Sequence, residues 1–178
     1  MKLGIYIALL FSIVLTTVNA QQFRLSVAPE FNFPTGNASS VSGIGFGGSL
    51  KAEIGVSEHY ALTASSGYNL FIGKKYLGTR IQNIEAIPTK LGLKYYGTPD
   101  FYIEGQVGAA FNGNNSAKTS LVWSPGFGTL IKTGSKKNKI DFGLRYESWT
   151  LKSKVSSAGI KSSNFGFVGL KLGYLFGL

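Results

Sequence analysis

Charged residues recur at every second or fourth position in several segments of this chain. In Asp141-Phe-Gly-Leu-Arg-Tyr-Glu147, the charged residues and a glycine occupy the odd positions, and bulky apolar residues fill the even ones. A strand places alternate side chains on opposite faces, so these charges share one face. Acids and bases in a poorly hydrated row can form ion pairs, whereas an unpaired buried charge is costly.

The chain is basic, with 18 Lys and Arg against 8 Asp and Glu and a formal net charge of +10. The charged residues that alternate with bulky apolar residues are nevertheless nearly balanced. Six bases and five acids share the small-residue face: Arg24, Glu30, Lys51, Glu53, Lys90, Lys94, Glu104, Asp141, Arg145, Glu147 and Lys171. The balance predicts a network of paired charges. For Arg145 we expect a partner among Glu147, Asp141 and Glu104, because same-face neighbours lie within reach of long side chains.

A glycine pattern, Gly43-x-Gly45-x-x-Gly48, matches a dinucleotide-binding fingerprint. That motif needs a strand before it and a helix after it, and here it lies inside an extended segment. We interpret these glycines as room for large side chains or strand curvature. No nucleotide cofactor is expected.

The single histidine, His59, is the other candidate for chemistry. With one His and no Cys, the chain cannot build a multi-histidine or cysteine-rich metal site, so we expect no metal. Ser57 and Glu58 would complete a triad by composition, but neighbours in a tight turn rarely converge as a triad requires. We expect no catalytic residue.

Eight segments carry the two-residue alternation: 23–33, 43–56, 60–72, 81–95, 101–111, 120–131, 140–147 and 164–178. The start of the fourth, 81–86, fits either loop or strand. The connections alternate between long and short, and each segment is long enough to cross a bilayer when tilted. The pattern predicts an all-β fold, an eight-stranded antiparallel up-and-down transmembrane β-barrel.

The composition of the two faces indicates which one meets lipid. One row holds bulky Leu, Ile, Phe and Tyr, and the other holds Gly, Ala, Ser and the charges. Eight strands leave an interior just wide enough for side chains, so the bulky row belongs outside. An open sheet would leave unpaired edges in lipid, so the barrel must close. A soluble barrel with an apolar interior is the alternative, although a solvent face of small residues does not favour it.

Residues 1–20 have the features of a secretory signal peptide. Lys2 provides the basic start, Ile5 to Val14 is an apolar run broken by Ser12, and Val18-Asn19-Ala20 is a small-residue cleavage site. We expect cleavage after residue 20, which leaves 21–178 as the barrel domain. Export also argues against nucleic acid, the partner that a basic chain would otherwise suggest.

The excess positive charge lies in or beside the predicted long loops: Lys74, Lys75, Arg80, Lys118, Lys152, Lys154 and Lys161. A basic residue near an anionic membrane surface gains about 1 kcal/mol. We therefore expect outer-membrane lipid and lipopolysaccharide as partners of these loops. Ordinary solvated loops are the alternative.

Four stretches carry a resemblance to a known family: Pro88–Tyr96, Tyr102–Phe111, Ile140–Glu147 and Phe167–Phe176. They resemble the small OmpX/OmpA-like outer-membrane β-barrel proteins, especially versions from Bacteroidetes-type bacteria. The resemblance covers residue 21 to the end and implies residence in the bacterial outer membrane, folding by the barrel-assembly machinery, and a monomer.

A structural or interaction role without enzymatic activity is the function we expect, with the lumen closed by paired charges. Two alternatives remain open. A lipid A-modifying barrel enzyme would, by resemblance, need a His and a Ser near the outer leaflet, whereas His59 is expected at the periplasmic end. A narrow passive channel would need a continuous wet lumen.

Overall fold

The computed structural model describes residues 22–76, 79–113, 119–134, 137–151 and 163–177. The predicted signal peptide, 1–20, lies outside them. The elements are β1 (Phe23–Thr35), α2 (Asn37–Val41), β2 (Ser42–Gly55), β3 (Tyr60–Gly73), β4 (Lys75–Tyr76), β5 (Thr79–Arg80), β6 (Ile84–Thr98), β7 (Phe101–Asn112), β8 (Ser120–Lys132), β9 (Lys139–Leu151) and β10 (Ser163–Gly177).

Eight of these strands close into a barrel in the order β1-β10-β9-β8-β7-β6-β3-β2, while β4 and β5 form a separate hairpin. All eight barrel pairings are antiparallel, including β1 with β10, which closes the sheet. The predicted fold class is therefore confirmed. Within the described residues, no helix is long and apolar enough to cross a bilayer.

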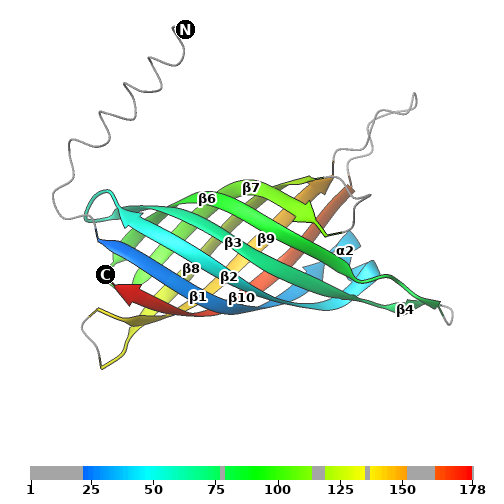
Figure 1. Cartoon of the computed structure of the whole chain (residues 1–178), viewed down its shortest axis with the longest axis horizontal. Helices are drawn as coiled ribbons and strands as arrows, with labels where there is room; N and C mark the ends of the chain where they lie inside the picture. The colour runs from blue at the N-terminus through cyan, green and yellow to red at the C-terminus, as the bar shows by residue number, and fades with distance from the viewer. Residues whose placement is uncertain (1–21, 77–78, 114–118, 135–136, 152–162, 178) are drawn as a thin grey trace, which may run out of the picture.

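The two ends of the barrel differ in their connections. Short turns at 56–59 and 99–100 lie at one end, together with the start of β1, the end of β8, the start of β9 and the end of β10. The other end carries α2, the β4–β5 hairpin, the end of β7, the start of β8, the end of β9 and the start of β10 (Figure 1). We call them the short-turn end and the long-loop end.

The side chains sort by strand parity. Outward positions hold large apolar residues that stay exposed, among them Leu50, Leu91 and Val107 at 67%, 66% and 63%. Inward positions are buried and hold glycine, serine and charged residues. Apolar surface of this extent is unfavourable in water by about 25 cal/mol per Å², so the exterior suits lipid.

Two local features were left open or missed by the sequence-based expectations. The strand in the ambiguous segment 81–86 begins at Ile84, and the polar segment after β1 contains the short helix α2. The helix starts after Gly36, whose φ of 56° is a left-handed conformation that glycine adopts readily.

Candidate functional site

The lumen is filled by ion pairs between strands. All eleven charged residues of the predicted network point into it. The pairs are Arg24–Glu53, Lys94–Glu53, Lys51–Glu104, Lys171–Asp141, Lys90–Glu147, Arg145–Glu147 and Arg145–Glu30. Their nitrogen–oxygen distances run from 2.5 to 3.0 Å. Charges in a lumen of low dielectric are tolerable when paired in this way and hydrogen-bonded to neutral neighbours.

Near the short-turn end, Glu53 is shared by two bases. Lys94 Nζ lies 2.5 Å from Glu53 Oε2, and Arg24 Nη1 lies 2.7 Å from Glu53 Oε1. The hydroxyl of Tyr96 donates to Glu53 Oε1 at 2.5 Å. Glu53 and Lys94 are almost fully buried, whereas 24% of the Arg24 side chain is exposed, so this group reaches the mouth of the barrel.

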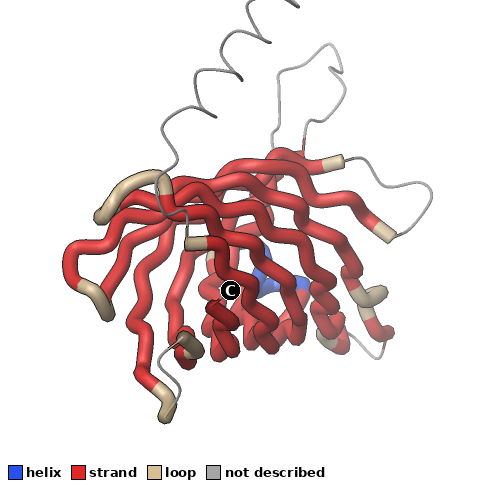
Figure 2. The backbone as a smooth tube through the Cα atoms, turned by 60° about the vertical axis from the view of Figure 1, so that its left-hand side comes forward, coloured by secondary structure: helices blue, strands red, loops and turns tan. Residues whose placement is uncertain are grey.

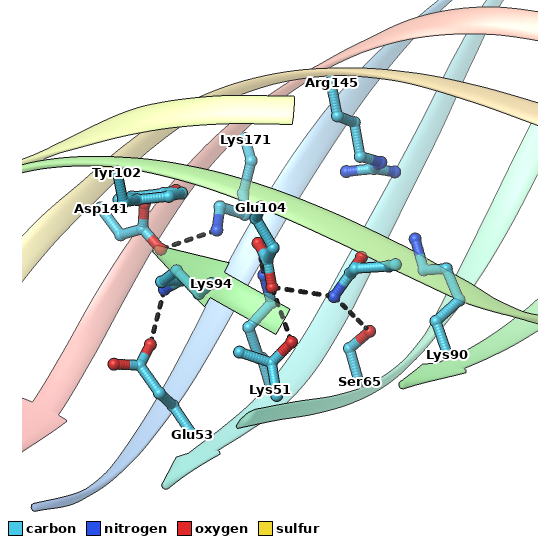
Figure 3. Close-up of polar contacts among 12 residues, drawn as sticks. Lys51, Glu53, Ser65, Lys90, Lys94, Tyr102, Glu104, Asp141, Arg145 and Lys171 are labelled. Carbon is cyan, nitrogen blue, oxygen red and sulfur yellow. Dashed lines mark hydrogen bonds and ion pairs between the residues drawn. The ribbon is translucent and has the colours of Figure 1, made fainter. Parts of the chain in front are cut away.

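Two further pairs occupy the middle of the lumen, where Figure 3 shows Glu104 among the amino groups of neighbouring lysines. Lys51 donates to Glu104 Oε2 at 2.6 Å, and Thr63 and Gln106 donate to the other oxygen. Lys171 donates to Asp141 Oδ2 at 2.6 Å. These carboxylates therefore have neutral donors available in addition to their lysines, as a buried charge requires.

Tyr102 joins these pairs to the residues near the short-turn end. Its hydroxyl donates to Asp141 Oδ1 at 2.5 Å, and Lys94 Nζ lies 4.2 Å from its ring centre, a cation–π contact. The phenol lies over two glycines of neighbouring strands. A Cβ built at Gly128 would come within 2.4 Å of the Tyr102 hydroxyl, and one at Gly143 within 3.0 Å. Both positions need glycine because the ring occupies the space of a side chain.

Arg145 joins the third group of charges. It donates from Nε to Glu147 Oε2 at 3.0 Å and from Nη2 to Glu30 Oε2 at 2.8 Å. Glu147 was among its predicted partners. Asp141 and Glu104 were not correct, because they pair with lysines.

The unpredicted partner, Glu30, lies on β1, beyond β10. Gly169 stands directly opposite Arg145 on β10. A Cβ on Gly169 would come within 3.2 Å of the Arg145 guanidinium carbon. The missing side chain therefore lets the arginine reach across β10 to β1.

Buried aromatic residues close the lumen on the long-loop side of the charges. Phe71, Trp149, Phe165 and Phe167 form one cluster with Ala38 of α2. Their ring centres lie 4.9–6.3 Å apart. Figure 2 shows α2 inside the ring of strands. Trp149 Nε1 donates to Glu147 Oε1 at 2.7 Å, which connects this aromatic cluster to the charges.

A second buried cluster lies near the short-turn end and contains Ala61, Tyr96, Tyr102, Leu130 and Leu175. The sequence analysis placed most of the interior aromatics on neither face. Strand parity could have found them, because counting back by twos from Lys171 leads to Phe167 and Phe165. The same count forward from Glu147 reaches Trp149.

Of the predicted basic loop residues, only two have described side chains. Lys74 and Lys75 are exposed at the long-loop end. Lys74 Nζ donates to the carbonyl of Ser39 at 2.7 Å and so holds the end of α2 against the hairpin segment. The Arg80 side chain and Lys118, Lys152, Lys154 and Lys161 lie outside the described residues.

His59 lies in the exposed turn between β2 and β3, at the short-turn end. Its ring stacks on Tyr95 with centroids 6.2 Å apart. The Ser57 hydroxyl accepts from the backbone N–H of Tyr60 at 3.1 Å, a bond that stabilises the turn. In the part of the chain that the structure describes, no group of three His, Cys, Asp or Glu could hold a metal ion.

A closed antiparallel barrel with an apolar exterior and a polar, ion-paired interior defines a transmembrane β-barrel. No family model and no curated protein sequence matches the chain. Solved structures with the same fold include those of small bacterial outer-membrane proteins.

Three of these structures illustrate the likeness. Neisserial surface protein A superposes with a TM-score of 0.59 at 14% identity, over 88% of this chain and 97% of that one. Ail, the attachment invasion locus protein of Yersinia pestis, gives 0.55 at 15% identity, over 89% and 100%. The outer membrane protein OprG from Pseudomonas aeruginosa gives 0.53 at 13%, over 90% and 97%.

At these identities the likeness shows the fold. The chain is an integral barrel of the bacterial outer-membrane type, and its predicted similarity to small OmpX/OmpA-like barrels is confirmed at that level. The narrower similarity to Bacteroidetes-type versions stays a prediction.

Proposed function

We propose that this protein is a closed, non-conducting barrel of the outer membrane whose role is structural or interactive. The observation that carries the proposal is the filling of the lumen at three heights. The aromatic cluster around Trp149, the ion pairs around Glu104 and the cluster of Tyr96 and Tyr102 follow one another along the axis. A hydrated ion would have to displace all three.

With the lumen closed, only the two ends and the lipid-facing exterior of the barrel are available to bind partners. Outer-membrane barrels carry their long loops on the extracellular side, so we assign the long-loop end, with Lys74 and Lys75, to that side. Lys75 is exposed there, which supports contact with the phosphates of lipopolysaccharide. The closed sheet leaves no unpaired strand edge, so the barrel needs no second subunit to complete its hydrogen bonds. We therefore propose a monomer.

The position of His59 supports a non-enzymatic role. It lies at the end opposite the long loops, and the nearby Ser57 hydroxyl accepts from backbone in a turn. A lipid A-modifying enzyme would need its nucleophile and base at the outer leaflet. Cleavage of residues 1–20 and delivery by the barrel-assembly machinery complete the proposal.

The test is conductance of the purified protein in planar lipid bilayers, with the migration of unheated and boiled samples on a gel as the check of folding. We expect a heat-dependent shift in migration and no steady current. Folded protein that conducts steadily would overturn the closed lumen and support a channel.

A further inference from the structure

A small cavity lies in the middle of the lumen, between the two hydrophobic clusters. Its volume is about 40 Å³. A water molecule needs roughly 10–15 Å³ by this measure, so the space holds a few waters or one small ion with water. All the residues that line it belong to strands.

The charges that line the cavity are unequal. Four are cations and two are carboxylates: Lys51, Lys90, Arg145 and Lys171 against Glu30 and Glu104. Asp141 and Glu147 neutralise Lys171 and Lys90 but are not part of the lining. The four cations are thus matched by four carboxylates, but only two of these carboxylates face the cavity, so cationic groups predominate on its surface.

Hydrogen-bond donors are also in excess. An ammonium group has three N–H donors and no acceptor. Lys51, Lys90 and Lys171 each donate to one carboxylate, at 2.6, 2.5 and 2.6 Å. Glu104 already accepts three hydrogen bonds, so the lining has far more capacity to donate than to accept.

Ser124 provides a separate observation. Its side chain lines the cavity and is 3% exposed. Its hydroxyl has no hydrogen-bond partner among the residues that the structure describes. A buried hydroxyl without a partner is destabilising, so an acceptor in the cavity would relieve that penalty.

We infer that this cavity binds one small inorganic anion of halide size, with the Ser124 hydroxyl and the surrounding ammonium groups as donors. A halide accepts several hydrogen bonds and donates none, which complements the lining better than water alone, since water must also donate. Its negative charge is attracted by the cationic groups that predominate on the cavity surface, which keep N–H donors free after pairing with their carboxylates.

The site rests on the proposed closed lumen, because an open pore would exchange the ion freely with solvent. Closure by itself does not require the ion, since a few waters could fill the same space. The anion enters as the barrel closes, because both ends of the lumen are packed with apolar side chains.

Bromide is the probe for the direct test. The full protein is refolded and crystallised in bromide, and anomalous diffraction is recorded at the bromine edge. We expect one anomalous peak in the cavity, within hydrogen-bond distance of Ser124 Oγ. Water density without an anomalous peak would overturn the anion site and leave the closed lumen standing.

A solution test uses stability. The unfolding temperature is measured in a bromide series against sulfate at constant ionic strength. We expect it to rise with bromide, as linkage to a bound ligand requires. Ser124→Ala should weaken or abolish this rise. The matched control is Ser120→Ala, a buried serine on the same strand outside the cavity lining, which should keep it.

An equal response of wild type and both variants would overturn the inference. Should Ser124→Ala fail to fold, Ser124→Asp offers a second route, because it places a fixed negative charge in the cavity. That variant should fold without halide dependence. The conductance experiment remains separate, so a steady current would be traced to failure of the closed lumen itself.

Discussion

Arg145 and Glu30 are 115 positions apart in the sequence, yet their side chains meet at 2.8 Å inside the barrel. The Arg145 side chain reaches Glu30 by passing over Gly169 of β10. Its Nε donates to Glu147. This arginine therefore joins the first strand to the last two and neutralises parts of two carboxylates.

Loss of this arginine should be costly. We expect Arg145→Ala to lower the free energy of unfolding by about 3 kcal/mol, because it leaves buried carboxylates short of a partner. Adding Glu30→Gln should recover part of that loss. A double-mutant cycle on unfolding in detergent or lipid measures the coupling. The control is Lys132→Ala, an exposed pair with Asp100, for which we expect no measurable effect. Equal effects of Arg145→Ala and Lys132→Ala would contradict the buried network.

The space under Tyr102 gives a packing test. Gly128→Ala places a methyl group against the Tyr102 hydroxyl and should destabilise the barrel by about 1–3 kcal/mol. Gly105→Ala is the matched control on β7, because nothing lies within 4 Å of a Cβ built there. Chemical denaturation in detergent distinguishes the two. Similar denaturation curves for Gly128→Ala and Gly105→Ala would show that the Tyr102 ring does not depend on the space left by Gly128.

The aromatic cluster at the long-loop end should matter more than aromatics of the lipid belt. Trp149→Ala removes a buried ring and the donor to Glu147, and we expect a loss of about 3–5 kcal/mol. Trp123→Ala removes a ring that is 44% exposed on the exterior and should cost much less. Unfolding free energies give the comparison. A larger loss of unfolding free energy for Trp123→Ala than for Trp149→Ala would contradict the view that interior packing is the main source of stability.

Binding of lipopolysaccharide should depend on the long-loop end. Lys75→Ala should weaken it by about 1 kcal/mol, roughly fivefold in affinity. Lys132→Ala, a 72% exposed lysine at the short-turn end, is the control and should bind as wild type does. Titration of the refolded protein with lipopolysaccharide micelles measures both. A weaker complex only for Lys132→Ala would reverse the proposed orientation.

His59 should be dispensable for lipid chemistry. We expect His59→Ala to leave the lipid A acylation pattern unchanged in cells that carry the protein. Mass spectrometry of extracted lipid A is the measurement, with an empty-vector strain for reference. A pattern that differs between wild type and His59→Ala would restore the enzyme hypothesis.

Local rules account for most of the fold. The two-residue alternation predicted the eight strands and the inward face of the eleven charged residues of the network, because strand parity depends only on neighbours along the chain. The start of β6 was left open, and the helix α2 was missed. A polar segment that follows a strand carries little periodicity, and α2 is held by the packing of Ala38 against aromatics from distant strands.

The identity of each partner could not be predicted, because it depends on how the sheet closes. Arg145 reaches Glu30 only because β1 pairs with β10 and Gly169 leaves the intervening space open. Likewise, Lys51 of β2 meets Glu104 of β7 across the lumen, a contact that no neighbouring-strand rule contains. The interior position of Phe71 was missed because its type matches the lipid-facing row.

The ion pairs across the lumen also constrain how the barrel can be assembled. Lys51 with Glu104, Lys90 with Glu147 and Arg145 with Glu30 each join strands that are not neighbours in the sheet. A sheet that lacked β9 and β10 would hold bare carboxylates and ammonium groups, and burying these in hydrocarbon is prohibitive. We therefore expect an incomplete sheet to enter hydrocarbon less readily than the closed barrel, in which each of these charges has its partner.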